Sequence, residues 1–382
     1  MNDDRFGNNA NNNSNNDGSP IDARRHQPGR GSCYGCPVRK KSKALMIISL
    51  LLAVLCLIVV VFISVFFRNF RISRLMSHED SFTQVQAAEL AHGEPMNLIT
   101  DYSVYCGDID GIKVDLVSAD VDIMPAEDDN IKVEWYSSRD KDDFDAIVTA
   151  DGGKLVIKEK QKGVFNFGWD DSSVVYIYVP AGDYDKFDID TTSGSISMLA
   201  DDALDVDKVD VSTVSGFMEI CGIDGADELE ASTTSGAINL SDVSSDKIDV
   251  STVSGTSALS GVTCNKFKGS STSGDISFNE FHALESEVKT VSGDTVYSGG
   301  ACPSVVLRST SGSLDFYSFA FDSLSMNTTS GDVYIGDIPG GDYIKLKSNT
   351  ISGDVYDYSE RIRDDGRIKI NFSATSGDIT IE

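Results

Sequence analysis

A Ser-Gly pair recurs ten times in the second half of this chain, and its spacing limits the folds that the chain can adopt. Successive serines are separated by 22, 20, 19, 19, 19, 19, 19, 22 and 24 residues. A period near twenty residues is typical of a repeat in which each copy forms one turn of a stack. The ten pairs consist of Ser193, Gly194, Ser215, Gly216, Ser235, Gly236, Ser254, Gly255, Ser273, Gly274, Ser292, Gly293, Ser311, Gly312, Ser330, Gly331, Ser352, Gly353, Ser376 and Gly377.

Apolar and polar residues alternate on both sides of each Ser-Gly pair. A Thr or Ser stands two residues before nine of the ten serines, and apolar residues dominate the positions four and six residues before them. Apolar residues return three and five residues after the serine, as Ile276 and Phe278 do. This period of two is that of a β-strand with one buried face. Each copy therefore predicts a strand, a corner, a second strand and a polar connection.

Two residue types at the corner have expected roles. We expect the glycine to adopt a backbone conformation that a side chain would forbid. An Asp often follows the glycine, and its carboxylate suits a free turn amide. These aspartates are Asp275, Asp294, Asp332, Asp354 and Asp378.

The constant phase of the repeat favours a parallel β-solenoid of about 19–24 residues per turn over a β-hairpin meander. In a solenoid, equivalent positions stack about 4.8 Å apart, so like residues form ladders. A meander gives no reason for the same residue at the same phase in every copy. The ninth copy breaks the inward pattern with Asp357, which predicts a local bulge or an early strand end.

The repeat defines the domain boundaries that we predict. Regular turns occupy residues 186–382, and residues 106–185 read as degenerate turns and a cap, with Ala119 in the glycine position. The aromatic loop 165–169 is either a cap or a partner contact. Residues 68–105 read as a stalk or linker.

Residues 44–67 are an uncharged apolar run, long enough to cross a bilayer as one helix. A cleaved signal peptide would have a shorter apolar core, so a retained anchor is the better interpretation. Seven basic residues lie between Arg24 and Lys43, just before the run, and three follow it, which predicts a cytoplasmic N-terminus and an extracytoplasmic C-terminal part. The tail 1–43 is Asn-rich and predicted to be disordered.

The N-terminal part of the chain is basic and the remainder is acidic. The chain has 60 acidic and 32 basic residues and a net charge of −28. Within it, residues 1–76 have a net charge of +7, which leaves the rest strongly acidic. An acidic body repels nucleic acid, so we predict no nucleic-acid partner.

Chemistry-bearing residues are sparse. The pair Cys33 and Cys36 is either half of a zinc site, completed by a second chain, or a pair of reduced or acylated thiols. Calcium along the aspartate column is conceivable, but solvated carboxylates are the default. Only His282 of the four histidines lies within the repeats, and Asp is spread over almost every turn, so that no carboxylate pair stands out. We therefore predict no cofactor and no catalytic site.

Four cysteines follow the predicted anchor, at positions 106, 221, 264 and 302. Cys264 and Cys302 share one phase of the repeat, two turns apart. That places them roughly 9–10 Å apart, beyond the reach of a disulfide. We therefore predict that these two are not bonded to each other.

The repeated Thr-x-Ser-Gly-Asp units, with the segments 121–125 and 176–182, resemble a bacterial family of "putative adhesins" of unknown function that includes LiaG-like envelope proteins. The resemblance covers about residues 108–382. It implies a right-handed β-solenoid in the cell envelope, with no catalytic residues to carry over.

Three functions follow as hypotheses. The first is a membrane-anchored, non-catalytic binding or scaffold module, adhesin-like or envelope-sensing, that contacts a cell-wall polymer or an envelope protein. The second is a glycan-processing β-helix enzyme. The third is a self-assembling surface element that associates through the C-terminal strand, which we expect to be an unpaired edge.

Overall fold

The computed structural model describes residues 96–139, 145–160, 172–200 and 204–382. The predicted tail and the predicted membrane span 44–67 lie outside the described residues. No helix in the described ranges is long and apolar enough to cross a membrane.

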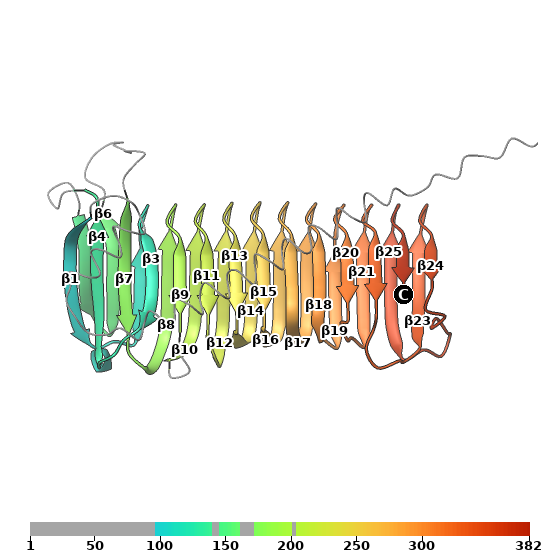
Figure 1. The fold of residues 1–382 in the computed structure, drawn as a ribbon, viewed down its shortest axis with the longest axis horizontal. Coiled ribbons are helices and arrows are strands. Elements are labelled where there is room, and N and C mark those ends of the chain that lie inside the picture. The colour runs from blue at the N-terminus through green and yellow to red at the C-terminus, as the bar shows by residue number, and fades with distance from the viewer. Residues whose placement is uncertain (1–95, 140–144, 161–171, 201–203) are drawn as a thin grey trace, which may run out of the picture. The chain divides into compact units, whose positions relative to one another are not determined.

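The described chain forms a β-solenoid, which confirms the fold class predicted from the repeat (Figure 1). Each repeat copy supplies one strand before its Ser-Gly corner and a shorter one after it, and each strand pairs in parallel with its counterparts. The first set, the long strands, is β8 (Gly182–Thr191), β10 (Leu204–Thr213), β12 (Ala226–Thr233), β14 (Ser244–Thr252), β16 (Thr263–Ser271), the second half of β17 (Ile276–Thr290), β19 (Ser304–Arg308), β21 (Ser323–Thr328), β23 (Ile344–Thr350) and β25 (Ile368–Ala374). The short strands are β9 (Ile196–Leu199), β11 (Met218–Cys221), β13 (Ile238–Ser241), β15 (Ser257–Ser260), the first half of β17, β18 (Thr295–Ala301), β20 (Leu314–Tyr317), β22 (Val333–Gly336), β24 (Val355–Asp357) and β26 (Ile379–Ile381).

The core lies between the two sets of strands and is built from stacked columns. Apolar residues at one phase of the repeat lie in register, so that Ile248 pairs with Leu229 on one side and with Phe267 on the other. Phe278, Tyr297 and Phe316 form an aromatic column, in which successive ring centroids are 4.2 and 5.1 Å apart and the ring planes are nearly parallel. Such stacking adds to the burial energy of each ring.

The corner glycines are required for close approach, and the conformational reason predicted from the sequence is wrong. None of the ten repeat glycines has a positive φ. A Cβ built on Gly255 would instead lie 1.5 Å from the carbonyl oxygen of Gly236 in the preceding turn. The same clash recurs along the whole column, which begins at Ala119, the predicted glycine equivalent.

Hydrogen bonds at the corner explain the other repeat residues. The Gly255 N–H donates to the Thr252 hydroxyl at 2.9 Å, and most other copies make the same bond. The aspartate after the glycine accepts a hydrogen bond from a backbone amide of the next turn. For example, Asp275 accepts one from the Asp294 N–H at 2.8 Å. This confirms the predicted role for Asp275, Asp294, Asp332 and Asp378, whereas Asp354 lies in the turn at the end of the stack.

The N-terminal end is a mixed parallel and antiparallel cap. Strands β2 (Gly111–Asp115) and β3 (Asp120–Pro125) form a turn against β8 and β9, and β6 (Lys154–Lys160) and β7 (Ser173–Val179) stack beyond it. Antiparallel strands close this end: β5 (Asp145–Asp151) on β6, β4 (Asn130–Ser137) on β7, and β1 (Asn97–Tyr105) on β4, with the short 3-10 helix η1 (Cys106–Asp108) after β1. The end of the predicted linker is therefore a strand. The aromatic loop 165–169 lies outside the described residues.

The last two turns are interleaved (Figure 1). Strand β25 pairs with β21 on one side and with β23 on the other, and β26 likewise lies between β22 and β24. The final turn in sequence is therefore inserted before the ninth copy, which forms the end of the rod. The expectation that the C-terminal strand is an unpaired edge is wrong, because β26 is paired on both sides. Self-association stays a prediction, and its edge would be β23 and β24.

The end position also explains the irregular ninth copy. Its Ser348 and Asp357 stand in columns that are otherwise apolar, next to Phe372 and Ile381. An end turn has a neighbour on one side only, so polar residues can occupy its inward positions at little cost. Strand β24 ends at Asp357, whose carboxylate accepts the Ser359 and Glu360 amides.

The four described cysteines are free thiols. Cys264 pairs in register with Ala283, and Cys302 stands at the same phase one turn further on. An intervening turn thus separates the two thiols. Burial raises the pKa of Cys264 to about 12 and that of Cys302 to about 11, which keeps both protonated at neutral pH.

Candidate functional site

The outer face of the long strands carries a ladder of ion pairs along most of the rod. Lys186 contacts Asp188 at 3.2 Å and Asp210 on the next strand at 3.1 Å. Further along, Glu228 lies between Lys208 and Lys247, whose hydrogen bonds lower its pKa to about 2. The ladder ends at Glu287, which pairs with Lys289 and with Arg308 on β19. Neighbouring turns are thus linked by alternating charge.

Beyond β17 the same face changes character, and we call this region the end face. It consists of the outward positions of β19, β21, β25 and β23, which are adjacent in that order. All twelve positions are at least partly accessible to solvent, none is acidic and four are basic. They are Ser304, Val306, Arg308, Ser323, Ser325, Asn327, Lys369, Asn371, Ser373, Lys345, Lys347 and Asn349.

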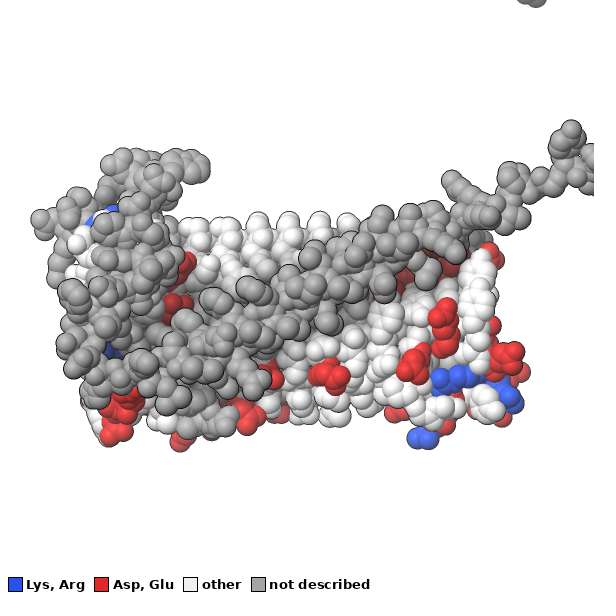
Figure 2. All heavy atoms as spheres, in the orientation of Figure 1, with Lys and Arg blue, Asp and Glu red and all other residues white. Residues whose placement is uncertain are grey.

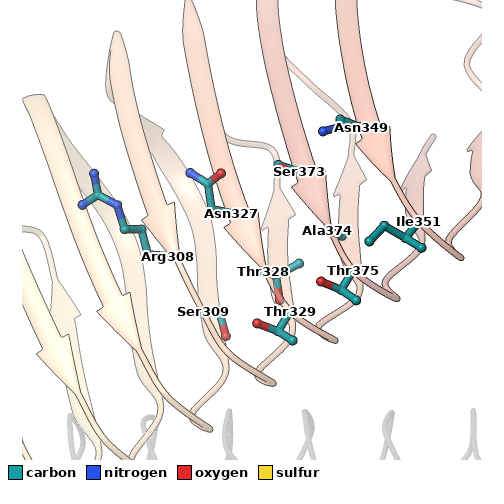
Figure 3. Close-up of a pocket in the computed structure, with 10 residues that line it drawn as sticks. All are labelled: Arg308, Ser309, Asn327, Thr328, Thr329, Asn349, Ile351, Ser373, Ala374 and Thr375. Carbon is teal, nitrogen blue, oxygen red and sulfur yellow. The ribbon is translucent and has the colours of Figure 1, made fainter.

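A groove of about 420 Å³ lies where the end face meets the corner of the solenoid (Figure 3). Arg308, Asn327, Ser373 and Asn349 line it from four neighbouring strands and project to the same side. Hydroxyl and methyl groups of the corner complete the lining. The lining residues are Arg308, Ser309, Asn327, Thr328, Thr329, Asn349, Ile351, Ser373, Ala374 and Thr375.

The groove can bind but has no group suited to nucleophilic or acid-base catalysis at neutral pH. Its polar lining consists of one guanidinium, two carboxamides and several hydroxyls, with no carboxylate, imidazole or thiol. Amides and hydroxyls both donate and accept hydrogen bonds, and a guanidinium donates to oxyanions. The arrangement therefore suits a polar ligand with oxygen acceptors.

An uncharged ridge runs beside the groove along the corners. It is formed by the repeat serines and the residues just before them, all of them exposed. Its upper edge is free of charged side chains where Figure 2 shows it. Val214, Val253, Val291 and Ile351 are 46–83% exposed in this row. The residue before the serine alternates between Thr and Val from Thr192 to Val291, so the ridge presents a row of exposed β-branched side chains.

The outer face of the short strands is acidic towards the C-terminal end, where Asp315 lies near Asp294 and Asp332 and tyrosines are present. Burial, together with Asp294 and Asp332, raises the pKa of Asp315 to about 6. The Tyr317 and Tyr334 rings lie 5.3 Å apart, and the Tyr334 hydroxyl donates to Glu382 at 2.8 Å. This face shares the end of the rod with the end face and has the opposite charge.

The sequence-predicted residues fall into two groups. The ten Ser-Gly pairs come together in one column at the corner, where each turn contacts the next. Cys33 and Cys36 lie outside the described residues, and the described part of the chain has no group of three or more His, Cys, Asp or Glu that could hold a metal. His282 is exposed on β17.

Sequence reasoning missed the groove, although a signal for it was present. At the outward positions of the long strands, the six copies from β8 to β17 hold eight acidic residues and the last four copies hold none. Comparing the outward columns, in addition to the inward ones, would have shown this change. The order of β25 and β23, which brings Asn327 beside Ser373, was not visible from spacing.

The chain belongs to the family described as "Toastrack DUF4097", whose model matches residues 109–298 and 263–382. This agrees with the resemblance drawn from the Thr-x-Ser-Gly-Asp units. The family is bacterial and has no known catalytic activity. No curated protein matches the chain.

Solved structures with a similar course of the chain have low sequence identity to it. A "putative adhesin" from Parabacteroides distasonis is 12% identical with a TM-score of 0.40, covering 76% of this chain and 98% of its own. A "putative adhesin" from Parabacteroides merdae is 13% identical with a TM-score of 0.41, covering 73% of this chain and 95% of its own. A "putative lipid binding protein" from Parabacteroides distasonis is 16% identical with a TM-score of 0.40, covering 73% of this chain and 96% of its own.

Proposed function

We propose that this protein is a non-catalytic binding module of the bacterial envelope, anchored by residues 44–67 and displayed outside the membrane. The observation that carries the proposal is the groove at the end of the rod. It gathers hydrogen-bonding side chains from four strands and holds no group for acid-base or nucleophilic chemistry. The ligand is a cell-wall polymer or an envelope protein.

The anchor and the orientation rest on the sequence. They are supported by the uncharged run 44–67 and by the excess of basic residues before it. Protease treatment of intact spheroplasts tests the topology: loss of the C-terminal part supports it, and protection contradicts it. The right-handed sense of the coil, implied by the family resemblance, stays a prediction.

A filled groove tests the binding function. We expect full-length protein in detergent to retain envelope material from its source bacterium, and Ser373→Trp to lose that retention. The matched control is Ser270→Trp, at the same phase of the repeat on β16, which places an equal side chain outside the groove. Equal retention by both variants would reject the groove as the contact site. No retention by the unaltered protein would reject the binding function itself.

A further inference from the structure

The charge on the long-strand face changes abruptly at β19. The outward positions of the six preceding long strands hold eight acidic and six basic residues, and those of the end face hold four basic residues and no acid. In a chain with a net charge of −28, an acid-free region on four adjacent strands departs from the surrounding pattern. A partner that supplies the missing negative charge would continue the ladder.

Three lysines of the end face have no acidic side chain as an ion-pair partner among the described residues. Lys345, Lys347 and Lys369 are exposed and make no ion pair with any residue that the structure describes. By contrast, Lys268, at the same phase as Lys347, contacts Asp249 at 3.0 Å. Arg308 shares Glu287 with Lys289, which leaves further guanidinium N–H groups for a ligand.

The dimensions of the end face fit a polymer segment better than a single ion. Three strand spacings separate Arg308 on β19 from Lys347 on β23, or about 15 Å. Asn327, Ser373 and Asn349 follow Arg308 across the strands and offer neutral hydrogen bonds along the way. A single phosphate or carboxylate can contact only one of these basic side chains at a time. A polymer with several such groups can contact Arg308 and Lys347 together.

The acidic groups around the end face weaken the attraction only partly. Glu287 borders it and already has two basic partners. Asp342, next to the start of β23, pairs with Arg367 at 3.6 Å. Asp322 is exposed at the start of β21. At physiological salt, the field of more distant exposed acids is largely screened beyond about 8 Å.

The residue composition of the end face favours a polysaccharide over a single-stranded nucleic acid as the polyanion. Proteins that bind single-stranded nucleic acid combine basic grooves with aromatic side chains on which bases stack. None of the twelve residues of the end face is aromatic. Amides and hydroxyls between cations instead match a ligand with many hydroxyls and spaced negative groups.

We propose that the end face and its groove bind an anionic polysaccharide, whose phosphate or carboxylate groups contact Arg308, Lys345, Lys347 and Lys369 while its hydroxyls bond the groove amides. This identification of the partner rests on the binding function proposed above. The phosphate- and carboxylate-bearing classes share the chemistry, and the test separates them.

Binding of defined polymers to the full-length protein in detergent tests the proposal. The probes are a glycerol-phosphate teichoic acid, a polyuronate, a neutral glucan and single-stranded DNA. We expect one or both anionic glycans to bind, more weakly as salt rises, and K345Q/K347Q to weaken binding about 25-fold, or about 5-fold per lysine. The control K266Q/K268Q removes equal charge from the same face at β16 and should change binding less than 2-fold.

Each outcome decides a separate point. A phosphate-only or uronate-only response identifies the anion. Equal loss in both lysine pairs, binding that is independent of salt, preference for the neutral glucan or equal affinity for DNA would each overturn the proposal. If envelope material is retained through the groove but none of the anionic glycans binds, the binding function stands and this identification of its partner falls.

Discussion

Replacing one corner glycine by alanine tests how the solenoid is held together. A Cβ on Gly255 would lie 1.5 Å from the Gly236 carbonyl oxygen, where real contacts are longer than 3.0 Å. The oxygen belongs to the backbone and the position of the Cβ is fixed by the backbone, so no side chain can rotate to make room. The two turns must therefore separate locally by about 1.5 Å or more.

That separation breaks the hydrogen bonds on both sides of the corner. The Ser254 N–H donates to the Thr234 oxygen, and the Ile238 N–H donates to the Thr256 oxygen, both at 2.9 Å. Two lost bonds cost about 1 kcal/mol each, and the strain of an overpacked site adds about 2 kcal/mol. We expect Gly255→Ala to reduce the free energy of unfolding by about 4 kcal/mol.

Urea denaturation of full-length protein in detergent, followed by far-ultraviolet circular dichroism, measures this loss. The control is Gly269→Ala, one turn further on, where the new Cβ would meet the Phe267 and Val288 side chains at 2.9 and 3.4 Å. Side chains can shift, so the control should lose about 1 kcal/mol or less. A loss below about 1 kcal/mol for Gly255→Ala would refute the close-approach explanation.

Three further predictions concern the core, the acidic face and the interleaved end. The Thr295 hydroxyl is buried without a hydrogen-bond partner, so Thr295→Val should stabilise the protein by about 1 kcal/mol in urea denaturation. The control Ser286→Ala removes a 2.8 Å hydrogen bond to Tyr297 and should destabilise the protein. A lower free energy of unfolding in both variants would contradict this reasoning. Because the pKa of Asp315 is raised to about 6, the folded state binds its proton more tightly than the unfolded state, so stability contributed by this site rises as pH falls from 6 towards 4. Asp315→Asn should stabilise the protein at pH 7 by about 1 kcal/mol, allowing for partial exposure, and an unchanged stability–pH profile would count against the shift. Deleting residues 359–382 removes β25 and β26 from between two turns, so hydrogen exchange should show lost amide protection in β23 and β24; retained protection there would indicate stacking in sequence order.

The sequence predicted the solenoid because stacking repeats the same environment in every turn. Columns such as Ile248 with Phe267, and the corner threonines, leave a period that can be read without coordinates. The role of glycine was misjudged because a Ser-Gly corner looks the same whether it needs an unusual φ or a close carbonyl oxygen. Spacing alone does not separate these two causes.

The interleaved end could not be predicted from the period, because exchanging two adjacent turns leaves every phase unchanged. Ser348 and Asp357 were the sequence signal of the interleaved order, since polar residues in apolar columns indicate an end turn. The groove depends on the same exchange, which places Ser373 between Asn327 and Asn349. Its residues belong to different copies, and no motif links them.

Cysteine pairs on the end face test the interleaved order, on which the site depends, most directly. Asn327 and Ser373 pair in register on neighbouring strands, so N327C/S373C should form a disulfide under mild oxidation, detected by mass spectrometry of a non-reduced digest. The positions 327 and 349 lie two strands apart, roughly 9–10 Å, and N327C/N349C should stay reduced. A disulfide in N327C/N349C and none in N327C/S373C would mean that the turns stack in sequence order, and the groove described here would not exist.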